Sequence, residues 1–332
     1  MNSPLVSICC ITYNHERYIK DALEGFVKQK TDFPFEIIIS DDCSTDKTHD
    51  IILDYKKKHP NLFRDVSPEA NLGVIENWKH VHQEAKGELI AFCEGDDYWT
   101  DQYKLQKQAT FMLSHSGCGL SITDFQYQND NDYNNLSEAA FSTLNTFQPK
   151  SFIEHLKNAG YIGPMTWMYR RRVFMQNIQD YNNIKDGTLA LALDLFGSSE
   201  VAYLPDVTAV YRTHSSSAAN PNSALKRLEY IKGVYNIQIM YAKKYKCNQE
   251  TIDNIQMQNY FTSMLLAIEC SDQAFIEEAK QFCFNKGLNI KWFIAACKEY
   301  VNYKKQYEHI QSSNAYQLGR AILQPFKWFK RI

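Results

Sequence analysis

From residue 5 to residue 115, short apolar runs alternate with amphipathic segments. The nearly continuous apolar runs at 5–12, 33–40 and 88–93 are typical of strands that are buried on both faces. A shorter run at 62–66 predicts one more strand, and apolar residues at helical spacing predict helices between the runs. Because strand and helix alternate with short connections, the pattern predicts an α/β fold with an open, mostly parallel sheet flanked by helices.

The pattern is less regular between residues 101 and 217. It predicts helices over 101–114 and 186–196, and strands over 118–125, 163–170, 201–204 and 208–211. Residues 126–150 are rich in Asn, Asp, Ser and Thr and show no clear period, so we interpret them as a loop.

From Ala224 onward the chain shows only helical spacing. Amphipathic patterns cover about 225–235, 250–268, 273–285 and 291–311, with no strand signal among them. We therefore expect an α/β domain at 1–220, followed by a helical appendage at 221–332 that faces the acceptor or a membrane.

Polar side chains follow three of the predicted strands. Tyr13-Asn14 comes after the first strand, Asp41-Asp42 after the second, and Glu94-Gly95-Asp96-Asp97 after the run at 88–93. Clustered carboxylates suit Mg²⁺ or Mn²⁺, whereas Gly and Asp by themselves also favour turns. In open parallel sheets, ligands bind outside the carboxyl ends of the strands, and all three clusters fall at such ends. Their shared edge favours a ligand site over turn chemistry.

Composition excludes several classes of protein. The net charge of −2 gives no basic field, so nucleic acid is not expected as a partner. The nine cysteines form no Cys-x-x-Cys pair and are interpreted as reduced thiols, not as a disulfide framework or a zinc site. There is no basic leader, and no apolar stretch approaches the ~18 residues of a membrane span. We expect a cytoplasmic protein whose membrane contact, if any, is peripheral.

The segment 318–332 has an unusual composition. It mixes four basic residues with large apolar and aromatic ones and contains no acid. That composition fits an interfacial segment on an anionic membrane, and it equally fits a terminal helix that packs on its own protein. Both interpretations stay open from the sequence.

Over residues 4 to 217, the chain resembles a family 2 inverting glycosyltransferase of the bacterial surface-polysaccharide type, which has the Rossmann-like GT-A fold. The resemblance is carried by the order and spacing of several motifs: Val6 to Asn14, Ile39 to Asp46, Asn71-Leu72-Gly73, Lys86-Gly87-Glu88, Glu94 to Trp99, and Tyr211-Arg212-Thr213-His214. It implies transfer of a sugar from a nucleoside-diphosphate sugar to a glycan or a polyprenyl-linked oligosaccharide, at the inner face of the cytoplasmic membrane.

The resemblance also implies roles for individual residues. Asp96 and Asp97 stand where the family binds Mn²⁺ or Mg²⁺, and His214 matches a position that joins the metal or the diphosphate. Glu94 replaces the first aspartate of the usual motif, which leaves open whether it contacts the metal, the ribose or water. The residues expected around the donor nucleotide are Ile11, Thr12, Tyr13, Asn14, Asp42, Asn71, Gly73, Asn77, Glu94, Gly95 and Arg212.

Inversion requires a base that deprotonates the acceptor hydroxyl. The family commonly carries Glu-Asp at the start of a late helix, where this chain has Lys185-Asp186-Gly187. The resemblance therefore implies Asp186 as the base, with Asp194 two turns later as the alternative. An aspartate at this place is also a frequent helix N-cap.

Two other functions remain open at this point. A nucleotidyltransferase that makes a sugar nucleotide also uses paired acids, but it usually needs a Gly-rich basic loop after the first strand, where this chain has Tyr13-Asn14-His15-Glu16. A non-catalytic sugar-nucleotide-binding module would keep the strand-end residues while losing Asp186 or the metal acids, and this chain retains both.

Overall fold

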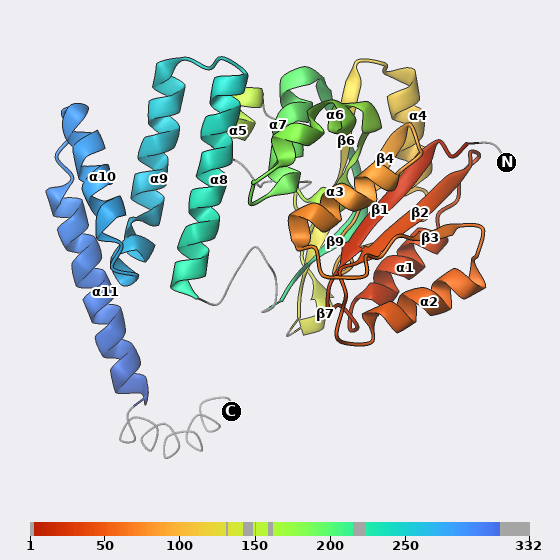
Figure 1. Cartoon of the computed structure of the whole chain (residues 1–332), viewed down its shortest axis with the longest axis horizontal. Coiled ribbons are helices and arrows are strands. Elements are labelled where there is room, and N and C mark those ends of the chain that lie inside the picture. The colour runs from red at the N-terminus through yellow and green to blue at the C-terminus, as the bar shows by residue number, and fades with distance from the viewer. Residues whose placement is uncertain are drawn as a thin grey trace, which may run out of the picture. The chain divides into compact units, whose positions relative to one another are not determined.

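The computed structural model describes residues 3–130, 132–141, 149, 151–158, 162–214 and 223–312 (Figure 1). The chain divides into two compact units. The first comprises Met1–Ala218 together with Asn236–Thr251, and the second comprises Ala219–Tyr235 and Ile252–Ile332.

The first half of the sheet is parallel. Strands β1 (Val6–Thr12), β2 (Phe35–Asp41), β3 (Phe63–Asp65) and β4 (Leu89–Phe92) lie in the order β3-β2-β1-β4. Every residue of β1 is buried, as its continuous apolar run predicts. The strands are separated along the chain by α1 (Ile19–Val27), α2 (Thr48–Lys58) and α3 (Val74–Glu84).

The second half of the sheet is mixed. Strand β8 (Met168–Arg170) lies antiparallel between β4 and β6 (Cys118–Asn129), and β9 (Glu200–Thr213) runs parallel to β6. Strands β5 (Tyr98–Trp99) and β7 (Asp132–Leu136) pair antiparallel with β9 and β6. Helices α4 (Lys104–Ser114), α5 (Phe152–Lys157), α6 (Arg171–Asn177) and α7 (Gly187–Ser198), with the 3₁₀ helices η1 (Pro164–Thr166) and η2 (Ile178–Tyr181), complete this part. The expected α/β class with C-terminal helices is confirmed (Figure 1).

Three expectations for this half were wrong in detail. The two short strands at 201–204 and 208–211 are one strand, because the pairing of β9 with β6 steps from Leu204 to Val207 and accommodates Pro205 and Asp206 as an irregularity. The expected loop at 126–150 begins with the end of β6 and contains β7. The expected strand at 163–170 is a 3₁₀ turn followed by the three residues of β8.

Helix α8 (Ala224–Lys244) belongs to both units. Its second half is held to the first unit by the side chain of Asp194 in α7, which accepts hydrogen bonds from Tyr241 at 2.8 Å and Lys244 at 2.5 Å. Asp194 is fully buried. Residues 236–251, within the expected appendage, are therefore bound to the α/β unit by a buried charged network.

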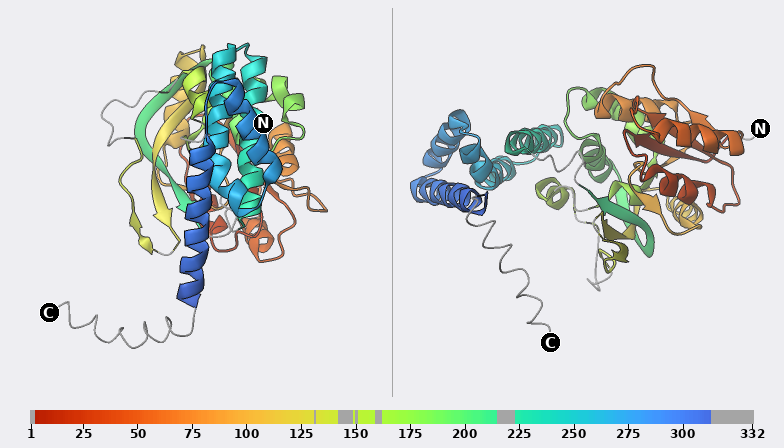
Figure 2. Two further views of the ribbon diagram at one scale, coloured as in Figure 1. Left: turned by 90° about the vertical axis from the view of Figure 1, so that its left-hand side faces the viewer. Right: turned by 90° about the horizontal axis from the view of Figure 1, so that it is seen from below.

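The second unit continues with α9 (Gln249–Glu269), α10 (Gln273–Asn285) and α11 (Lys291–Ser312). These helices lie side by side (Figure 2) around buried Met264, Phe275, Ile276 and Cys283. Within the described ranges, no helix has both the length and the apolar character that a membrane span requires. The segment 318–332, whose composition fits either membrane contact or a terminal helix that packs on its own protein, lies outside the described residues.

Candidate active site

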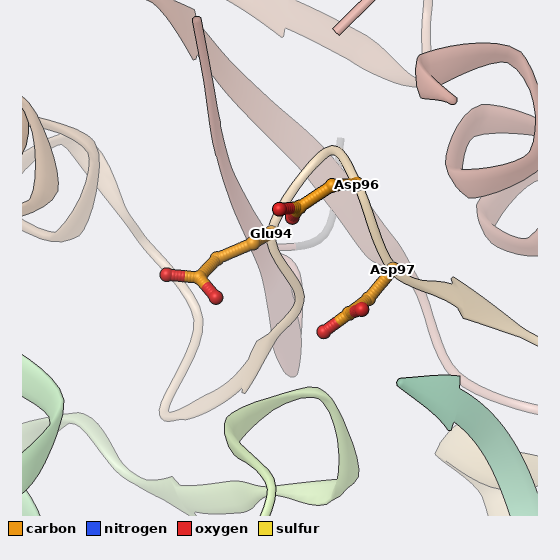
Figure 3. A group of neighbouring side chains, drawn as sticks. All are labelled: Glu94, Asp96 and Asp97. Carbon is orange, nitrogen blue, oxygen red and sulfur yellow. The ribbon is translucent and has the colours of Figure 1, made fainter. Parts of the chain in front are cut away.

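The acidic cluster lies in the turn between β4 and β5. Glu94, Asp96 and Asp97 each present a carboxylate oxygen, and these three oxygens lie within 4.8 Å of one another (Figure 3). Gly95 brings the turn close to the end of β1, because its N–H donates to Ile11 O at 2.9 Å. A Cβ at position 95 would lie only 2.6 Å from Thr12 Oγ1, so a side chain there would push the turn away from β1.

The three carboxylates destabilise one another. Burial, together with the charges of Asp96 and Asp186, raises the pKa of Glu94 to about 8. Burial also raises the pKa of Asp97 well above its ordinary value, with added repulsion from Asp96 and Glu94. Oδ1 of Asp96 is buried and has no hydrogen-bond partner within the described part of the chain. A set of oxygen donors that is half-buried at Glu94 and Asp96 and buried at Asp97, with this much mutual repulsion, fits a divalent cation.

Two histidines flank Asp96. Nε2 of His214 lies 3.0 Å from Asp96 Oδ2, and Nε2 of His15 lies 3.8 Å from the same oxygen. Burial works to raise the pKa of Asp96, but the hydrogen bond from His214 and the field of His15 outweigh it and lower that pKa. His214 thus reaches the predicted metal site through Asp96. His15 is a site residue that sequence reasoning missed, although it directly follows Tyr13-Asn14 at the same edge of the sheet.

Arg212 stabilises the acidic turn through hydrogen bonds. Its backbone N–H donates to Asp97 Oδ1 at 2.8 Å, and its guanidinium donates to Asp96 O at 3.2 Å and to Gln128 Oε1 at 3.0 Å. The guanidinium also pairs with Asp21 and is itself buried. These contacts give Arg212 a supporting role in the acidic turn, and its expected place around the donor nucleotide stays a prediction.

Asp42 organises the loop that leads into α3. Its carboxylate accepts from the backbone N–H groups of Leu72 at 2.7 Å and Gly73 at 3.0 Å, and Asn71 Nδ2 donates to Asp42 O at 2.7 Å. Asn71 and Gly73 therefore lie beside Asp42, and their expected contact with the nucleotide stays a prediction. The structure does not place Asn77 with them at the surface of the site: it is buried, and its Nδ2 donates to Ser40 O at 3.1 Å, so that it holds α3 against β2.

The end of β1 meets the loop after β2. Asn14 has a positive φ of 55°, and its Oδ1 accepts from Thr45 N at 2.8 Å. Ile11 and Thr12 are buried beside the acidic turn, whereas the ring of Tyr13 is exposed. Thr12 O accepts from Asp42 N at 3.0 Å, so the predicted nucleotide residues and the acidic cluster share one edge of the sheet.

Asp186 is the N-cap of α7. Its Oδ1 accepts from Leu189 N and from Thr188 Oγ1, both at 2.8 Å, which fixes the orientation of the carboxylate. Asp186 also lies near enough to Glu94 for its charge to raise the pKa of Glu94. The side chain expected to act as the base is therefore within electrostatic reach of the acidic cluster, and its role stays a prediction.

The expectation that Asp194 could act as the alternative base was wrong. It is fully buried, and its carboxylate accepts from Tyr181, Tyr241, Tyr245 and Lys244. The side chain is used to attach α8 to α7 and is closed off from any acceptor hydroxyl.

Known proteins are similar to this chain over part of its length. An uncharacterised protein of Mycobacterium bovis, Mb1547, is 36% identical over 210 residues, which are 63% of this chain and 59% of that relative. The match thus spans less than two thirds of the relative's length. The poly(ribitol-phosphate) beta-N-acetylglucosaminyltransferase TarS of Staphylococcus aureus is 38% identical over 114 residues, which are 33% of this chain and 19% of TarS.

Two solved structures share the fold. The structure of S. aureus TarS 1–349 with UDP-GlcNAc superposes with a TM-score of 0.54 at 16% identity, over 86% of this chain and 93% of that one. The mannosyltransferase PcManGT of Pyrobaculum calidifontis, solved with GDP-Man and Mn²⁺, superposes with a TM-score of 0.52 at 14% identity, over 98% of this chain and 88% of that one. The family model described as glycosyl transferase family 2 matches residues 7–177, and the chain belongs to that family of glycosyltransferases.

Proposed function

We propose that this glycosyltransferase moves a sugar, with inversion, from a nucleoside-diphosphate sugar to a glycan or lipid-linked glycan. The named ligands of two fold neighbours, UDP-GlcNAc and GDP-Man, support this class of donor. The polymer acceptor in the name of TarS supports a surface glycan. Family membership argues against a nucleotidyltransferase, and Asp186 beside the acidic cluster argues against a purely binding module.

The observation that carries the proposal is the cluster of three carboxylates, in which Oδ1 of Asp96 is buried and has no hydrogen-bond partner within the described residues. Asp96 and Asp97 would hold Mn²⁺ or Mg²⁺, and Glu94 adds a third donor on the same turn. When bound, such an ion supplies Lewis-acid neutralisation of the departing diphosphate. His214 would hold Asp96 in its ionised form through their hydrogen bond.

Asp186 is proposed as the general base. It takes the proton of the acceptor hydroxyl while that oxygen bonds to the anomeric carbon, and the bond from this carbon to the diphosphate breaks on the opposite face. The N-cap bonds to Thr188 and Leu189 keep the carboxylate in one orientation during this step.

The donor nucleotide is proposed to lie along the ends of β1 and β2. Tyr13 provides an exposed ring for the base, and Ile11, Thr12 and Asn14 line that end of β1. Asp42, Asn71 and Gly73 form the opposite side. With a polyprenyl-linked acceptor, the enzyme would work at the inner face of the cytoplasmic membrane, with residues 318–332 as a further lipid contact.

A thermal-shift panel tests the donor and the metal. UDP-, GDP- and dTDP-sugars are each added with and without Mn²⁺, and we expect one nucleotide to raise the melting temperature only when the metal is present. Asp186→Asn should retain that shift and lose turnover, because it removes only the base. A panel without any metal-dependent shift would contradict the transferase proposal, whereas retained turnover would move the base to another residue.

A further inference from the structure

Two tyrosines lie side by side near the carboxyl ends of β6 and β9. Tyr127 in β6 is the register partner of Tyr211 in β9, and the two strands are parallel, so both side chains lie on the same face of the sheet. Their ring centroids are 5.8 Å apart with the planes at 81°, which is an edge-to-face arrangement. Tyr127 is 45% exposed and Tyr211 is half-buried. We call these two side chains the tyrosine pair.

The surroundings of the tyrosine pair hold it in place. The ring of the buried Phe125 makes an edge contact with the ring of Tyr127 at a centroid distance of 5.1 Å. The backbone of Tyr127 is fixed as well, because its O accepts from Ser137 N at 2.9 Å and its N–H donates to Ser137 Oγ at 2.8 Å. A ring that is held on one side and exposed on the other binds a ligand with little loss of conformational entropy.

The tyrosine pair lies next to the acidic turn. The amide that joins Tyr211 to Arg212 donates its N–H to Asp97 Oδ1 at 2.8 Å. Burial raises the pKa of the Tyr211 hydroxyl, and the charges of the three carboxylates of the acidic turn add to that rise. The backbone contact and the direction of the pKa shift both place Tyr211 beside the carboxylates.

The order of the strands separates the tyrosine pair from the expected nucleotide residues. Because β8 lies antiparallel between β4 and β6, strands β6 and β9 run in the direction of β4, and their carboxyl ends lie at the same edge of the sheet. Along that edge, the acidic turn after β4 lies between the ends of β1 and β2 on one side and those of β6 and β9 on the other. With the nucleotide at β1 and β2, the acceptor approaches from the β6 and β9 side, because inversion requires attack opposite the departing diphosphate.

We propose that the tyrosine pair binds an uncharged pyranose ring of the acceptor glycan. The C–H groups of a pyranose form an apolar face that packs on an aromatic ring, while the sugar hydroxyls stay within reach of water and of the tyrosine hydroxyls. This inference rests on the proposed function and narrows the class of its acceptor.

The charges near the tyrosine pair disfavour an acceptor that carries phosphate. The ionised groups that act on the pKa of Tyr211 are all acids. The nearby guanidinium of Arg212 is buried and already pairs with Asp21. A divalent cation and a donor diphosphate would together add no net positive charge. A polyol-phosphate polymer is therefore a poorer fit to this place than a neutral sugar.

Saturation-transfer NMR on the full chain tests the proposal, with cellotetraose and chitotetraose as neutral probes and ribitol 5-phosphate as the charged one. Irradiation of the aromatic protons of the protein should transfer saturation to the ring C–H protons of the neutral sugars and not to ribitol 5-phosphate. Tyr127→Ala should weaken the binding of the neutral sugars by about tenfold, because one aromatic contact is lost. Tyr127→Phe keeps the ring and should keep most of the affinity.

Tyr103→Ala is the matched control, because Tyr103 is 44% exposed and lies at the start of α4, outside the acidic turn. This variant should bind the sugars as the unaltered protein does. Equal losses in Tyr103→Ala and Tyr127→Ala, or unchanged binding in Tyr127→Ala, would overturn the proposal. So would saturation transfer to neither neutral sugar, or competition of ribitol 5-phosphate with them.

The donor provides a second readout. The metal-dependent thermal shift with the donor nucleotide should be unchanged in Tyr127→Ala, because this ring lies on the other side of the acidic turn. Loss of that shift would assign the tyrosine pair to the donor and overturn the proposal. The sugars are measured without donor or metal, so the two proposals can fail separately. Sugar binding that depends on Tyr127, without any donor shift in the unaltered protein, would support the tyrosine pair as a glycan site and contradict the transferase proposal.

Discussion

The benzo ring of Trp78 lies against the backbone of Gly187. A Cβ at position 187 would be 2.6 Å from Cε3 of Trp78 and 2.8 Å from Cζ3, so no side chain fits between them. Trp78 is buried and makes edge contacts with the rings of Phe174 and Tyr181, with centroids 5.2 and 5.3 Å away. Gly187 is the first residue of α7 and follows Asp186, so this ring sets the position of the proposed base.

The same helix reaches the proposed nucleotide site. α3 begins after Gly73, whose N–H is held by the carboxylate of Asp42, and one turn later it presents Trp78 to Gly187. A single helix therefore connects the loop expected to bind the nucleotide with the start of the helix that carries the proposed base. A small displacement of α3 would move both the loop expected to bind the nucleotide and the start of α7.

Gly187→Ala should slow turnover without weakening donor binding. The added methyl group must displace the start of α7, and a shift of about 1 Å in a catalytic group can lower kcat by about a hundredfold. The metal-dependent thermal shift with the donor, and the KM for the donor, should stay unchanged. Steady-state kinetics measure kcat and the KM for the donor separately.

A compensating substitution tests the steric explanation. Trp78→Phe removes the distal ring, so the double variant Gly187→Ala/Trp78→Phe should regain most of the lost kcat. Gly117→Ala is the matched control, because a Cβ there meets only the flexible side chain of Glu200 at 3.3 Å. If the double variant is no faster than Gly187→Ala alone, the ring contact does not set the position of the base.

Asp97→Asn should stabilise the metal-free protein and abolish its response to Mn²⁺. The amide oxygen can still accept from the N–H of Arg212, while the repulsion with Asp96 and Glu94 disappears. We expect the free energy of unfolding without metal to rise by about 1 kcal/mol, a gain typical of relieving strain at a functional site. Urea unfolding with and without Mn²⁺ and the nucleotide measures both effects.

The exposed Asp54 on α2 provides the control for Asp97. Asp54→Asn removes one carboxylate charge far from the acidic turn and should leave stability and metal response within about 0.5 kcal/mol of the original. A variant at Asp97 that keeps its metal-dependent stabilisation would mean that the cation, if bound, lies elsewhere.

The first half of the fold was predictable because its signals are local. β1, β2 and β4 are apolar runs that end in polar residues, and parallel strands must bring those ends to one edge. The acidic turn after β4 was recognisable for the same reason. Gly95, Asp96 and Asp97 follow the strand directly, and no long-range information is needed to place them.

The second half depends on contacts that a sequence does not display. The Pro205-Asp206 pair looks like the end of a strand, but the irregular pairing with β6 lets β9 continue through it. His15 is assigned to the site only because the fold brings it near Asp96. The supporting contacts of Arg212 and Asn77 are made with strands that are distant in the sequence. Asp194 shows helical spacing from Asp186, yet its buried partners Tyr241 and Lys244 come from α8.

Asp194→Asn should destabilise the protein and leave its chemistry intact. The substitution removes the charge that faces Lys244 in a buried network, and breaking such a pair costs about 3 kcal/mol. The exposed side of the same network is the control, because Asp180→Asn removes a half-exposed partner of Lys244 and should cost less than about 1 kcal/mol. Loss of turnover in Asp194→Asn at unchanged stability would restore Asp194 as a candidate base.

The buried Lys104 should make the free energy of unfolding rise with pH. Its ammonium is fully buried, donates to Gln108 Oε1 at 2.5 Å and lies 4.6 Å from the ring centre of Trp99. Burial lowers the pKa of Lys104 from 10.5 to about 7, although Cys93 and Asp101 act in the opposite direction. Between about pH 7 and pH 10.5, the side chain of Lys104 is protonated in the unfolded chain and neutral in the folded chain. The free energy of unfolding should therefore rise with pH in that window, by roughly 1.4 kcal/mol per unit, and level off below about pH 7.

Lys104→Met keeps an unbranched side chain, one atom shorter, and removes the titratable amine, so most of that slope should vanish in the variant. Near pH 7, where the unaltered protein bears the full penalty, replacing a buried charge by an apolar group should stabilise the fold by about 2 kcal/mol. Lys107 is the matched control on the same helix, since its hydrogen bonds to Asp101 and Asp206 raise its pKa instead. Urea unfolding at about pH 7, 8 and 9 compares the slopes. Because other groups titrate equally in all three proteins, a Lys104→Met slope equal to that of Lys107→Met would show that Lys104 is not the source of the pH dependence.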